Sequence, residues 1–465
     1  MKHNALNSSG TPRRSSKTFY EMNHPSRKGL EDLRFYVHTF GCQMNENDSE
    51  RISGLLLHEG AVPASTFEES DLIIINTCAV RRKSEEKLYS LLGRLEYLKK
   101  SKNIVVGVVG CVAQLRKKEI IKKKPVIDFL IGPDNYHKLT SRLQPQTALK
   151  TCQTGWSRGW NEIPSDKTMR KSRTSAYVTV MEGCDNFCAY CVVPFTRGRE
   201  KFRPLENILV EIRDLASRGY TEIHLLGQNV NSYQDPETKK DFSSLLESVD
   251  RISGVEWVRF ITSHPKIFSD DIIKTMRDGD HICHHLHLPA QSGASSVLER
   301  MNRGYTAPEY LEKIRLLKEA MPDIGLSTDI IVGFPGETEE EHRDTLRLLE
   351  MVRFRNIFSF RYSPRPRTAA EKLDDDIPHE VKKRRLLEVQ SLQKKIQIEF
   401  NASVVGVKMK VHCLGKSKKN PRVYSGRNEG YQVVNFESDS NVIGRFVDVV
   451  ITSCGPYSLR GTAVQ

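Results

Sequence analysis

The sequence predicts an α/β protein with three folded parts: an N-terminal domain built on a parallel sheet, a partial (β/α)6 barrel, and a small C-terminal β-barrel of the OB type. Three observations predict this class. Short aliphatic runs alternate with segments of helical periodicity from about residue 33, which indicates βαβ units. The alternation pauses at 154–175 and then resumes for six more units. After about residue 400 the pattern is strand-like, with Gly and Asn turns, as in small all-β barrels.

The N-terminal domain is predicted at 34–153. Its strands are expected at 33–39, 71–76 and 103–109, where β-branched or aliphatic runs are separated by segments of helical periodicity. Residues 1–33 are rich in Ser, Lys, Arg and Asn, so a disordered basic extension is predicted there. Such a composition also fits an organellar transit peptide, but a solvated tail is favoured.

A polar segment at 154–175 is predicted to be a linker, and the barrel domain is predicted at 176–399. Each barrel strand is followed by a turn and usually by a helical segment; the six strands are expected at 176–181, 222–226, 257–262, 284–288, 326–332 and 357–362. Six such units fit an open barrel rather than a complete eightfold one.

A basic helix is predicted at 378–401, and the small barrel follows at 400–465. Strand-like alternation covers 404–415, 422–436 and 444–464, and the region has a net charge of +5 from nine Lys or Arg against four Asp or Glu. A small basic barrel is typical of a nucleic-acid-binding module, although a merely well-solvated barrel has a similar composition. The candidate RNA contacts are Lys416, Lys418, Lys419, Arg422 and Arg427.

The composition limits the classes of function. A net charge of +13, from 71 basic and 58 acidic residues, favours a polyanionic partner. The apolar runs are far shorter than the ~18 residues of a membrane span, so no membrane is expected. Ten cysteines in a long chain without a signal-peptide pattern are expected to be reduced, and the clustered ones to bind metal.

The most specific motif is the CxxxCxxC spacing of Cys184, Cys188 and Cys191, which directly follows the first predicted barrel strand. Three thiolates within eight residues can hold one cubane [4Fe-4S] cluster and leave one iron open for chemistry. Structural zinc prefers four protein ligands, and no fourth Cys or His lies nearby in the sequence. A zinc site completed by a distant ligand is the less favoured alternative.

Three more cysteines share one context. Cys42, Cys78 and Cys111 each follow the carboxyl end of a predicted N-terminal strand. Ligands gather at these ends in open parallel sheets, so the three thiolates can converge on a second cluster. From spacing alone, three separately buried structural thiols are equally favoured.

Together these features resemble the methylthiotransferase branch of the radical-SAM superfamily, from about residue 34 to the end of the chain. That branch has an N-terminal cysteine domain, a radical-SAM barrel and a C-terminal TRAM barrel. The resemblance implies two 4Fe-4S clusters: a radical-SAM cluster at Cys184, Cys188 and Cys191, and an auxiliary cluster for sulfur delivery at Cys42, Cys78 and Cys111. It also implies S-adenosylmethionine (SAM) at the open iron, where electron transfer gives a 5′-deoxyadenosyl radical.

The resemblance also suggests which residues contact SAM, because such barrels hold it at the carboxyl ends of their strands. The candidates lie at these ends or beside the cluster cysteines: Tyr190, Gly227, Gln228, Asn229, Ser263, Gln291 and Asp329. Except for Tyr190, turn chemistry and strand capping explain these positions about equally well. Arg197 and Arg199 are expected to meet SAM or phosphates, or to pair with local acids. No catalytic residue beyond the clusters is predicted.

Short segments assign the subfamily. Residues 39–45, 48–50, 191–200 and 362–366 resemble the MiaB-type branch, which modifies isopentenyl-adenosine in tRNA. Two related branches act on threonylcarbamoyl-adenosine in tRNA or on an aspartate of a ribosomal protein, and they are expected to differ directly after Cys42. A non-catalytic, zinc-stabilised RNA-binding protein is a third and less favoured hypothesis.

The implied reaction replaces hydrogen at carbon 2 of the adenine at tRNA position 37 with a methylthio group. SAM serves as both methyl donor and radical source. The expected partners are tRNA carrying isopentenyl-adenosine, an electron donor protein and a sulfur source. A cytoplasmic monomer is expected.

Overall fold

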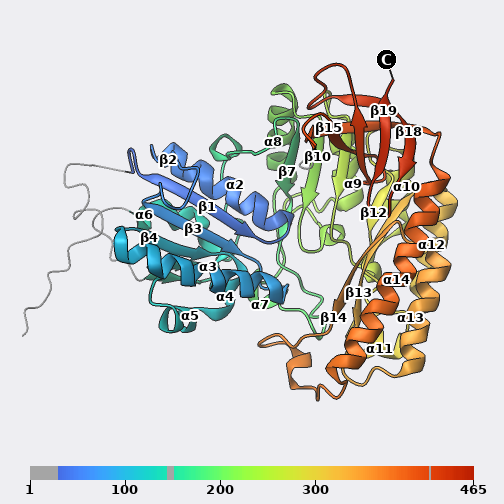
Figure 1. Cartoon of the computed structure of the whole chain (residues 1–465), viewed down its shortest axis with the longest axis horizontal. Helices are drawn as coiled ribbons and strands as arrows, with labels where there is room; N and C mark the ends of the chain where they lie inside the picture. The colour runs from blue at the N-terminus through green and yellow to red at the C-terminus, as the bar shows by residue number, and fades with distance from the viewer. Residues whose placement is uncertain (1–29, 144–150, 418–419, 465) are drawn as a thin grey trace, which may run out of the picture.

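The computed structural model describes residues 30–143, 151–417 and 420–464. Most of the predicted basic extension and two candidate RNA contacts, Lys418 and Lys419, lie outside the described residues. Figure 1 shows the N-terminal domain beside the open barrel, with the C-terminal barrel at one end of the barrel strands. No helix in the described part of the chain is long and apolar enough to cross a bilayer.

The N-terminal domain is a parallel sheet of order β2-β1-β3-β4-β5-β6 with helices on both faces. Its central strands are continuous apolar runs, such as the fully buried β3, because both faces are covered. One face packs α2 and α6, and the other packs α3, α4 and α5. The bounds are β1 (Arg34–Phe40), β2 (Val62–Pro63), β3 (Leu72–Thr77), β4 (Val105–Val109), β5 (Phe129–Ile131), β6 (Thr151–Gln153), α2 (Gln43–His58), α3 (Arg82–Ser101), α4 (Cys111–Arg116), α5 (Lys118–Lys123), η1 (Pro133–Lys138) and α6 (Leu139–Arg142).

The segment expected to be a linker packs against both domains that it joins. It contains one short turn of helix, η2 (Ser165–Lys167). Ile163 is buried in the N-terminal core, and Arg170 forms a buried ion pair with Glu211 of the barrel at 2.5 Å. This segment therefore fixes the two domains relative to each other.

The barrel has six parallel strands in the order β7-β10-β11 and β12-β13-β14, and a Val258–Ile282 bridge joins the two halves. Capping boxes at Thr306 and Thr338 explain where α12 and α13 begin. The strands are β7 (Ser175–Thr179), β10 (Glu222–Leu226), β11 (Trp257–Phe260), β12 (His285–His287), β13 (Gly325–Val332) and β14 (Asn356–Arg361).

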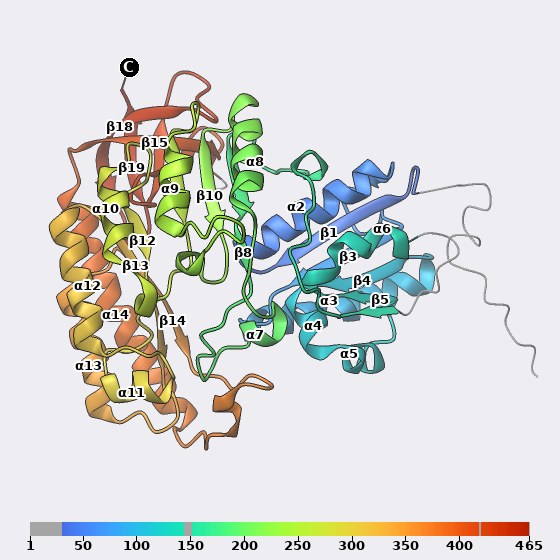
Figure 2. The same cartoon turned by 180° about the vertical axis from the view of Figure 1, so that it is seen from behind.

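The covering helices are α8 (Leu205–Ser217), α9 (Phe242–Asp250), α10 (Asp270–Asp278), α11 (Ser295–Arg300), α12 (Ala307–Ala320) and α13 (Glu339–Val352). Smaller elements line the loops: β8 (Met181–Glu182), α7 (Val193–Thr196), β9 (Lys201–Phe202), η3 (Val230–Ser232), η4 (Pro265–Ile267) and η5 (Ala369–Lys372). The fold is the predicted open barrel, and Figure 2 shows its helices from behind.

A long helix, α14 (His379–Ser403), leads into a closed five-stranded barrel of order β15-β16-β17-β19-β18. Its strands are β15 (Lys408–Lys416), β16 (Tyr424–Asn428), β17 (Val433–Glu437), β18 (Phe446–Cys454) and β19 (Leu459–Ala463). The predicted strand region from 404 begins late, because α14 continues to Ser403 and a turn follows.

The C-terminal barrel docks on the larger barrel through buried charges. Glu222 of β10 accepts hydrogen bonds from Arg259 of β11 at 2.7 Å and from His412 of β15 at 3.0 Å. Arg259 also donates to the backbone carbonyls of Asn428 and Glu429 at 2.9 and 2.6 Å. These contacts fix the turn between β16 and β17 against the larger barrel.

Candidate active site

The register of the N-terminal sheet brings Cys42, Cys78 and Cys111 together. Phe40 pairs with Thr77, and Asn76 pairs with Val109, so the three cysteines follow neighbouring strands at one edge. Adjacent strands lie about 4.8 Å apart, which places the three thiols within reach of one group. The contact with Cys78 lowers the pKa of Cys42 to about 6. The same contact, burial and the nearby Cys111 thiol raise the pKa of Cys78.

Two asparagines hold these loops. Asn45 Oδ1 accepts a hydrogen bond from the Cys42 amide at 3.4 Å, and Asn45 donates to Asn76 Oδ1 at 3.0 Å. Gly110 has φ +87°, and a side chain there would collide with Asn76 Oδ1. The segment directly after Cys42, Gln43–Asn45, lies within the 39–45 match to the MiaB-type branch. It also has a structural role, because Asn45 connects the Cys42 loop to β3.

The second cysteine triplet lies on the loop after β8. Gly183 directly precedes it with φ +87°, where a side chain would collide with the Arg199 carbonyl. Asn186 donates to Cys184 Sγ at 3.5 Å, and Cys188 Sγ lies 3.9 Å from His264 Nε2. Burial raises the pKa of Cys184 to about 11 and that of Cys191 to about 12.

A buried ion pair joins the two cysteine loops. Arg197, six residues after Cys191, pairs with Asp48 of α2 at 2.5 Å, and both side chains are almost fully buried. The Tyr136 hydroxyl donates to Asp48 Oδ2 at 3.2 Å. Of the roles considered for Arg197 and Arg199, pairing with acids is the one observed: Arg199 contacts Asp185 at 3.0 Å.

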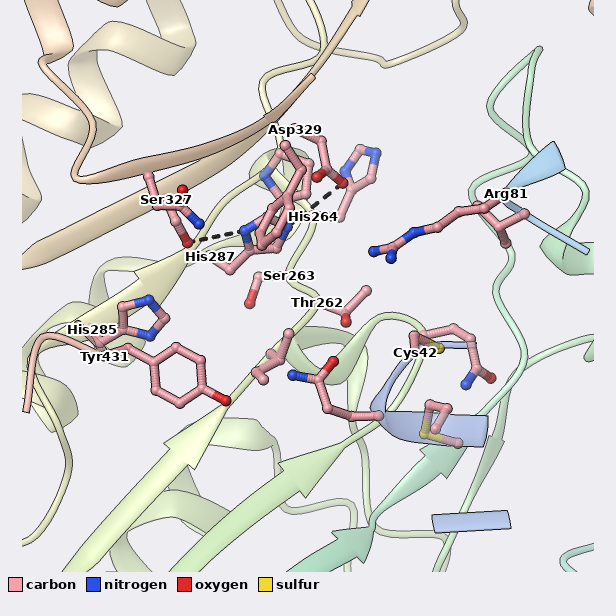
Figure 3. Close-up of a pocket in the computed structure, with 18 of the residues that line it drawn as sticks. Cys42, Arg81, Thr262, Ser263, His264, His285, His287, Ser327, Asp329 and Tyr431 are labelled. Carbon is pink, nitrogen blue, oxygen red and sulfur yellow. Dashed lines mark hydrogen bonds and ion pairs between the residues drawn. The ribbon is translucent and has the colours of Figure 1, made fainter. Parts of the chain in front are cut away.

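Both triplets line a single cavity of about 660 Å³. All seven candidate SAM contacts line it too, together with Arg427 of the C-terminal barrel. Figure 3 shows Cys42 and Tyr431 facing the cavity from opposite sides of the view, with Thr262 and Ser263 between them. His285 and His287 also line the cavity, and His287 contacts Ser327 at 3.0 Å.

Unpartnered polar atoms in this cavity fit a polar cofactor. Four of the candidate SAM contacts have a buried side-chain atom with no hydrogen-bond partner among the described residues: Gln228 Nε2, Asn229 Oδ1, Ser263 Oγ and Gln291 Oε1. Buried polar groups are normally hydrogen-bonded, so these four atoms are available to a polar ligand in the cavity. Donors and acceptors are both present, which suits the amino, carboxylate and ribose groups of SAM.

The cysteine triplets suit iron–sulfur clusters better than a single ion. No set of three or more His, Cys, Asp or Glu side chains in the described ranges is arranged to hold one metal ion. In a cubane each cysteine binds a different iron, so the sulfurs surround the cluster instead of meeting at one point. All six candidate cysteines are free thiols.

The candidate RNA contacts divide into two groups. Lys416 and Arg422 are exposed on the C-terminal barrel, away from the cavity lining. Arg427 instead packs on the Tyr431 ring at 4.1 Å and donates to the Tyr431 carbonyl at 2.8 Å. Arg427 is therefore part of the cavity wall.

Three cavity residues had no signal in the sequence. Arg303 follows α11, Arg355 precedes β14, and Tyr431 comes from the turn between β16 and β17. None belongs to a motif, and the fold alone brings them to the cysteines. Tyr431 has φ +65°, a conformation that is uncommon for an aromatic residue.

Comparisons with known proteins agree with this architecture. The family described as "Uncharacterized protein family UPF0004" matches residues 34–132, the "Radical SAM superfamily" matches residues 178–349, and the "TRAM domain" matches residues 403–464. The three matches fall on the three folded parts.

Full-length relatives decide the family. The tRNA-2-methylthio-N(6)-dimethylallyladenosine synthase of Acetivibrio thermocellus is 44% identical over 454 residues, covering 96% of this chain and 94% of the relative. The enzyme of the same name from Chlorobium luteolum is 45% identical over 435 residues, covering 93% and 97%. The chain belongs to the tRNA-2-methylthio-N(6)-dimethylallyladenosine synthase family. The predicted family and the predicted enzyme class, a radical-SAM tRNA methylthiotransferase, are thus confirmed.

Solved structures show the same fold at low identity. The radical SAM methyltransferase TsrM from Kitasatospora setae, bound to tryptophan and a SAM analog, is 12% identical with a TM-score of 0.55. That match covers 82% of this chain and 78% of TsrM. The cobalamin-dependent radical enzyme OxsB is 13% identical with a TM-score of 0.50, covering 79% and 56%. This chain therefore shares its fold with these radical-SAM enzymes.

Ser263→Ala is expected to weaken SAM binding while leaving the unfolding temperature equal or higher. The Ser263 hydroxyl is buried without a partner among the described residues. If it contacts SAM as expected, its removal deletes a hydrogen bond worth about 1 kcal/mol in the complex, so Kd should rise roughly fivefold. Calorimetric titration with SAM and thermal unfolding measure the two effects. Ser243→Ala is the matched control, because that hydroxyl is also buried and unpartnered but lies outside the cavity lining. An unchanged Kd for Ser263→Ala would rule out this contact.

Proposed function

We propose that this protein adds a methylthio group to carbon 2 of N6-isopentenyladenosine at position 37 of tRNA. The observation that carries the proposal is one cavity lined by both cysteine triplets and by all seven candidate SAM contacts. Family membership supplies the substrate class, because the relatives are named for the methylthio product of dimethylallyl-adenosine in tRNA.

The cofactors are two 4Fe-4S clusters and SAM. Cys184, Cys188 and Cys191 would hold the radical-SAM cluster, and the triplet of Cys42, Cys78 and Cys111 would hold the auxiliary one. SAM at such a cluster supplies a methyl group and an organic radical, and the radical route suits an aromatic carbon–hydrogen bond that acid–base chemistry does not break. The polar side chains at 228, 229, 263 and 291 orient SAM, and the buried Arg197–Asp48 pair keeps the two cysteine loops in a fixed relation.

The C-terminal barrel brings the tRNA to this cavity. A base must leave its stack to reach a buried reactive group, and aromatic side chains provide faces on which such a base stacks. Tyr431 presents its ring to the cavity, and Arg427 packs on the ring at 4.1 Å. The turn that binds the larger barrel therefore also forms part of the substrate pocket.

The remaining partners follow from the chemistry. The reaction needs a low-potential electron donor protein and a source of sulfur in addition to tRNA. We place the protein in the cytoplasm as a monomer, in contact with the tRNA pool. The alternative, organellar targeting by the basic N-terminal extension, concerns residues that lie largely outside the described part of the chain.

Mass spectrometry of tRNA nucleosides tests the substrate. A deletion strain should accumulate isopentenyl-adenosine and lose its methylthio derivative, and the wild-type gene should restore it. Persistence of methylthio-isopentenyl-adenosine at normal levels in a strain without a paralogue would contradict the proposal. A loss confined to methylthio-threonylcarbamoyl-adenosine, or to the methylthio group of a ribosomal-protein aspartate, would favour the related branches instead.

The double variant Lys416→Gln, Arg422→Gln should bind tRNA with a weaker salt dependence. Each lost phosphate contact lowers the slope of log Kd against log salt by roughly 0.7–0.9, so the slope should fall by about 1.5. Fluorescence anisotropy with labelled tRNA at several salt concentrations measures it. Lys408→Gln is the control, because Lys408 is already paired with Asp448 at 3.0 Å. An equal slope for wild type and double variant would show that neither Lys416 nor Arg422 contacts tRNA phosphates.

A further inference from the structure

A buried cation touches the middle cysteine of the CxxxCxxC motif. Arg303 is 4% exposed, and its Nη1 lies 3.3 Å from Cys188 Sγ. The same nitrogen lies 3.3 Å from the Tyr190 hydroxyl. The motif contains no basic residue, so this charge comes to the cysteine loop from a distant part of the chain, the loop after α11.

The other contacts of Arg303 are neutral. Its Nε donates to the Tyr305 hydroxyl at 3.0 Å, and its Nη2 donates to the Pro289 carbonyl at 2.8 Å. Other deeply buried arginines, such as Arg197 with Asp48 and Arg259 with Glu222, are ion-paired with a carboxylate. Arg303 has no carboxylate within ion-pair distance among the described residues, and its nearest anionic candidate is the Cys188 thiolate.

A buried charge without a counter-charge is strongly unfavourable. The Arg303 guanidinium gains a counter-charge if Cys188 binds a cluster, because a 4Fe-4S cubane held by three thiolates is negatively charged overall. One-electron reduction makes it more negative still. A fixed guanidinium beside one ligand sulfur stabilises the reduced form more than the oxidised form, since its attraction grows with the negative charge.

We propose that Arg303 tunes the reduction potential of the radical-SAM cluster, by acting as the counter-charge and hydrogen-bond donor at Cys188. This inference rests on the cluster assignment made under the proposed function. Arg303 is a positioning and electrostatic residue: it raises the cluster potential toward that of a low-potential one-electron donor, and no bond to Arg303 forms or breaks.

Redox titration of the anaerobically reconstituted full-length protein, followed by electron paramagnetic resonance, tests the proposal. The signal that changes on addition of SAM marks the radical-SAM cluster, and the auxiliary cluster serves as an internal reference. In Arg303→Met the ratio of reduced to oxidised radical-SAM cluster at a fixed potential should fall at least about tenfold, a shift of about 59 mV for one electron. In Arg303→Lys, which retains the charge, the potential of the radical-SAM cluster should shift less. The potential of the auxiliary cluster should not change in either variant.

Two further variants separate charge from structure. Arg303→Gln keeps hydrogen-bond donors without the charge, so its potential should lie below that of wild type and at or above that of Arg303→Met. Arg300→Met removes a nearby arginine that is paired with Glu341 at 2.9 Å, and its potential should equal that of wild type. A wild-type potential in Arg303→Met or Arg303→Gln with full iron content would overturn the proposal. So would loss of the cluster in both variants, which would mean that Arg303 serves assembly. A wild-type protein without a SAM-sensitive signal would overturn the proposed function, and this inference with it.

Discussion

Cys78→Ala is expected to reduce the iron content of the reconstituted protein from about eight to about four atoms per chain and to abolish methylthio transfer. Cys78 is buried at the carboxyl end of β3, where its thiol contacts Cys42. Apart from Cys42 and Cys111, the cysteines that line the cavity in the described part of the chain belong to the second triplet. Reductive cleavage of SAM should continue, because Cys184, Cys188 and Cys191 lie on a separate loop. Iron and sulfide analysis, together with chromatography of 5′-deoxyadenosine and of tRNA nucleosides, measures the three quantities.

Cys152→Ala is the matched control for this variant. Cys152 lies in β6 of the same sheet, is also a free thiol, and does not line the cavity. It should retain about eight irons and full activity. Eight irons in Cys78→Ala would show that the auxiliary site uses other ligands. Four irons in wild type, unchanged in Cys78→Ala, would restore the alternative of three separately buried thiols.

The sequence was most informative where chemistry and local pattern coincide. Cys184, Cys188 and Cys191 are close in the chain, so their spacing alone predicts a common ligand. Cys42, Cys78 and Cys111 are far apart in the chain, but each lies within two residues of the carboxyl end of a strand. The parallel register of the three strands then brings the cysteines together. The strand-end positions 228, 229, 263 and 291 could be predicted for the same reason, because the carboxyl ends of barrel strands form one face.

Residues brought to the site by packing between distant segments could not be predicted. Arg303 lies between a helix end and a glycine, and nothing in its neighbours indicates a contact with Cys188 more than a hundred positions earlier. Tyr431 lies in a turn of the C-terminal barrel, and its place in the cavity depends on how that barrel docks. Docking in turn depends on Glu222, Arg259 and His412, three residues from two domains that show no shared pattern in the sequence.

Glu222→Gln is expected to destabilise the protein by about 3–5 kcal/mol, because it leaves the Arg259 guanidinium buried without its carboxylate. Both side chains are at most 2% exposed, so solvent cannot replace the lost charge. The C-terminal barrel should loosen first, since Arg259 also holds the Asn428 and Glu429 carbonyls and Glu222 holds His412. Hydrogen–deuterium exchange should then be faster in β15 and β16, and the unfolding midpoint should fall.

The matched control is Glu256→Gln at the same interface. Glu256 pairs with Lys410 of the C-terminal barrel at 3.1 Å, but both side chains are about half exposed. Exposed ion pairs contribute at most about 1 kcal/mol, so this variant should unfold close to wild type. Equal midpoints for the two variants would show that the buried network does not hold the barrels together.

The pH dependence of the difference between wild type and Glu222→Gln provides a second check. Burial alone would raise the pKa of Glu222, but His224, His412 and Arg259 together hold that pKa well below its usual range. A carboxyl with a depressed pKa in the folded state stabilises the protein fully above its unfolded pKa of about 4.3 and loses this stabilisation as pH falls toward the folded value. The difference in free energy of unfolding between wild type and variant should therefore be constant at neutral pH and become smaller below about pH 4.

Because the same network positions the turn that carries Tyr431, Glu222→Gln should also lower tRNA modification more than SAM cleavage at neutral pH. An equal loss of both activities would mean that the docked barrel does not shape the substrate pocket.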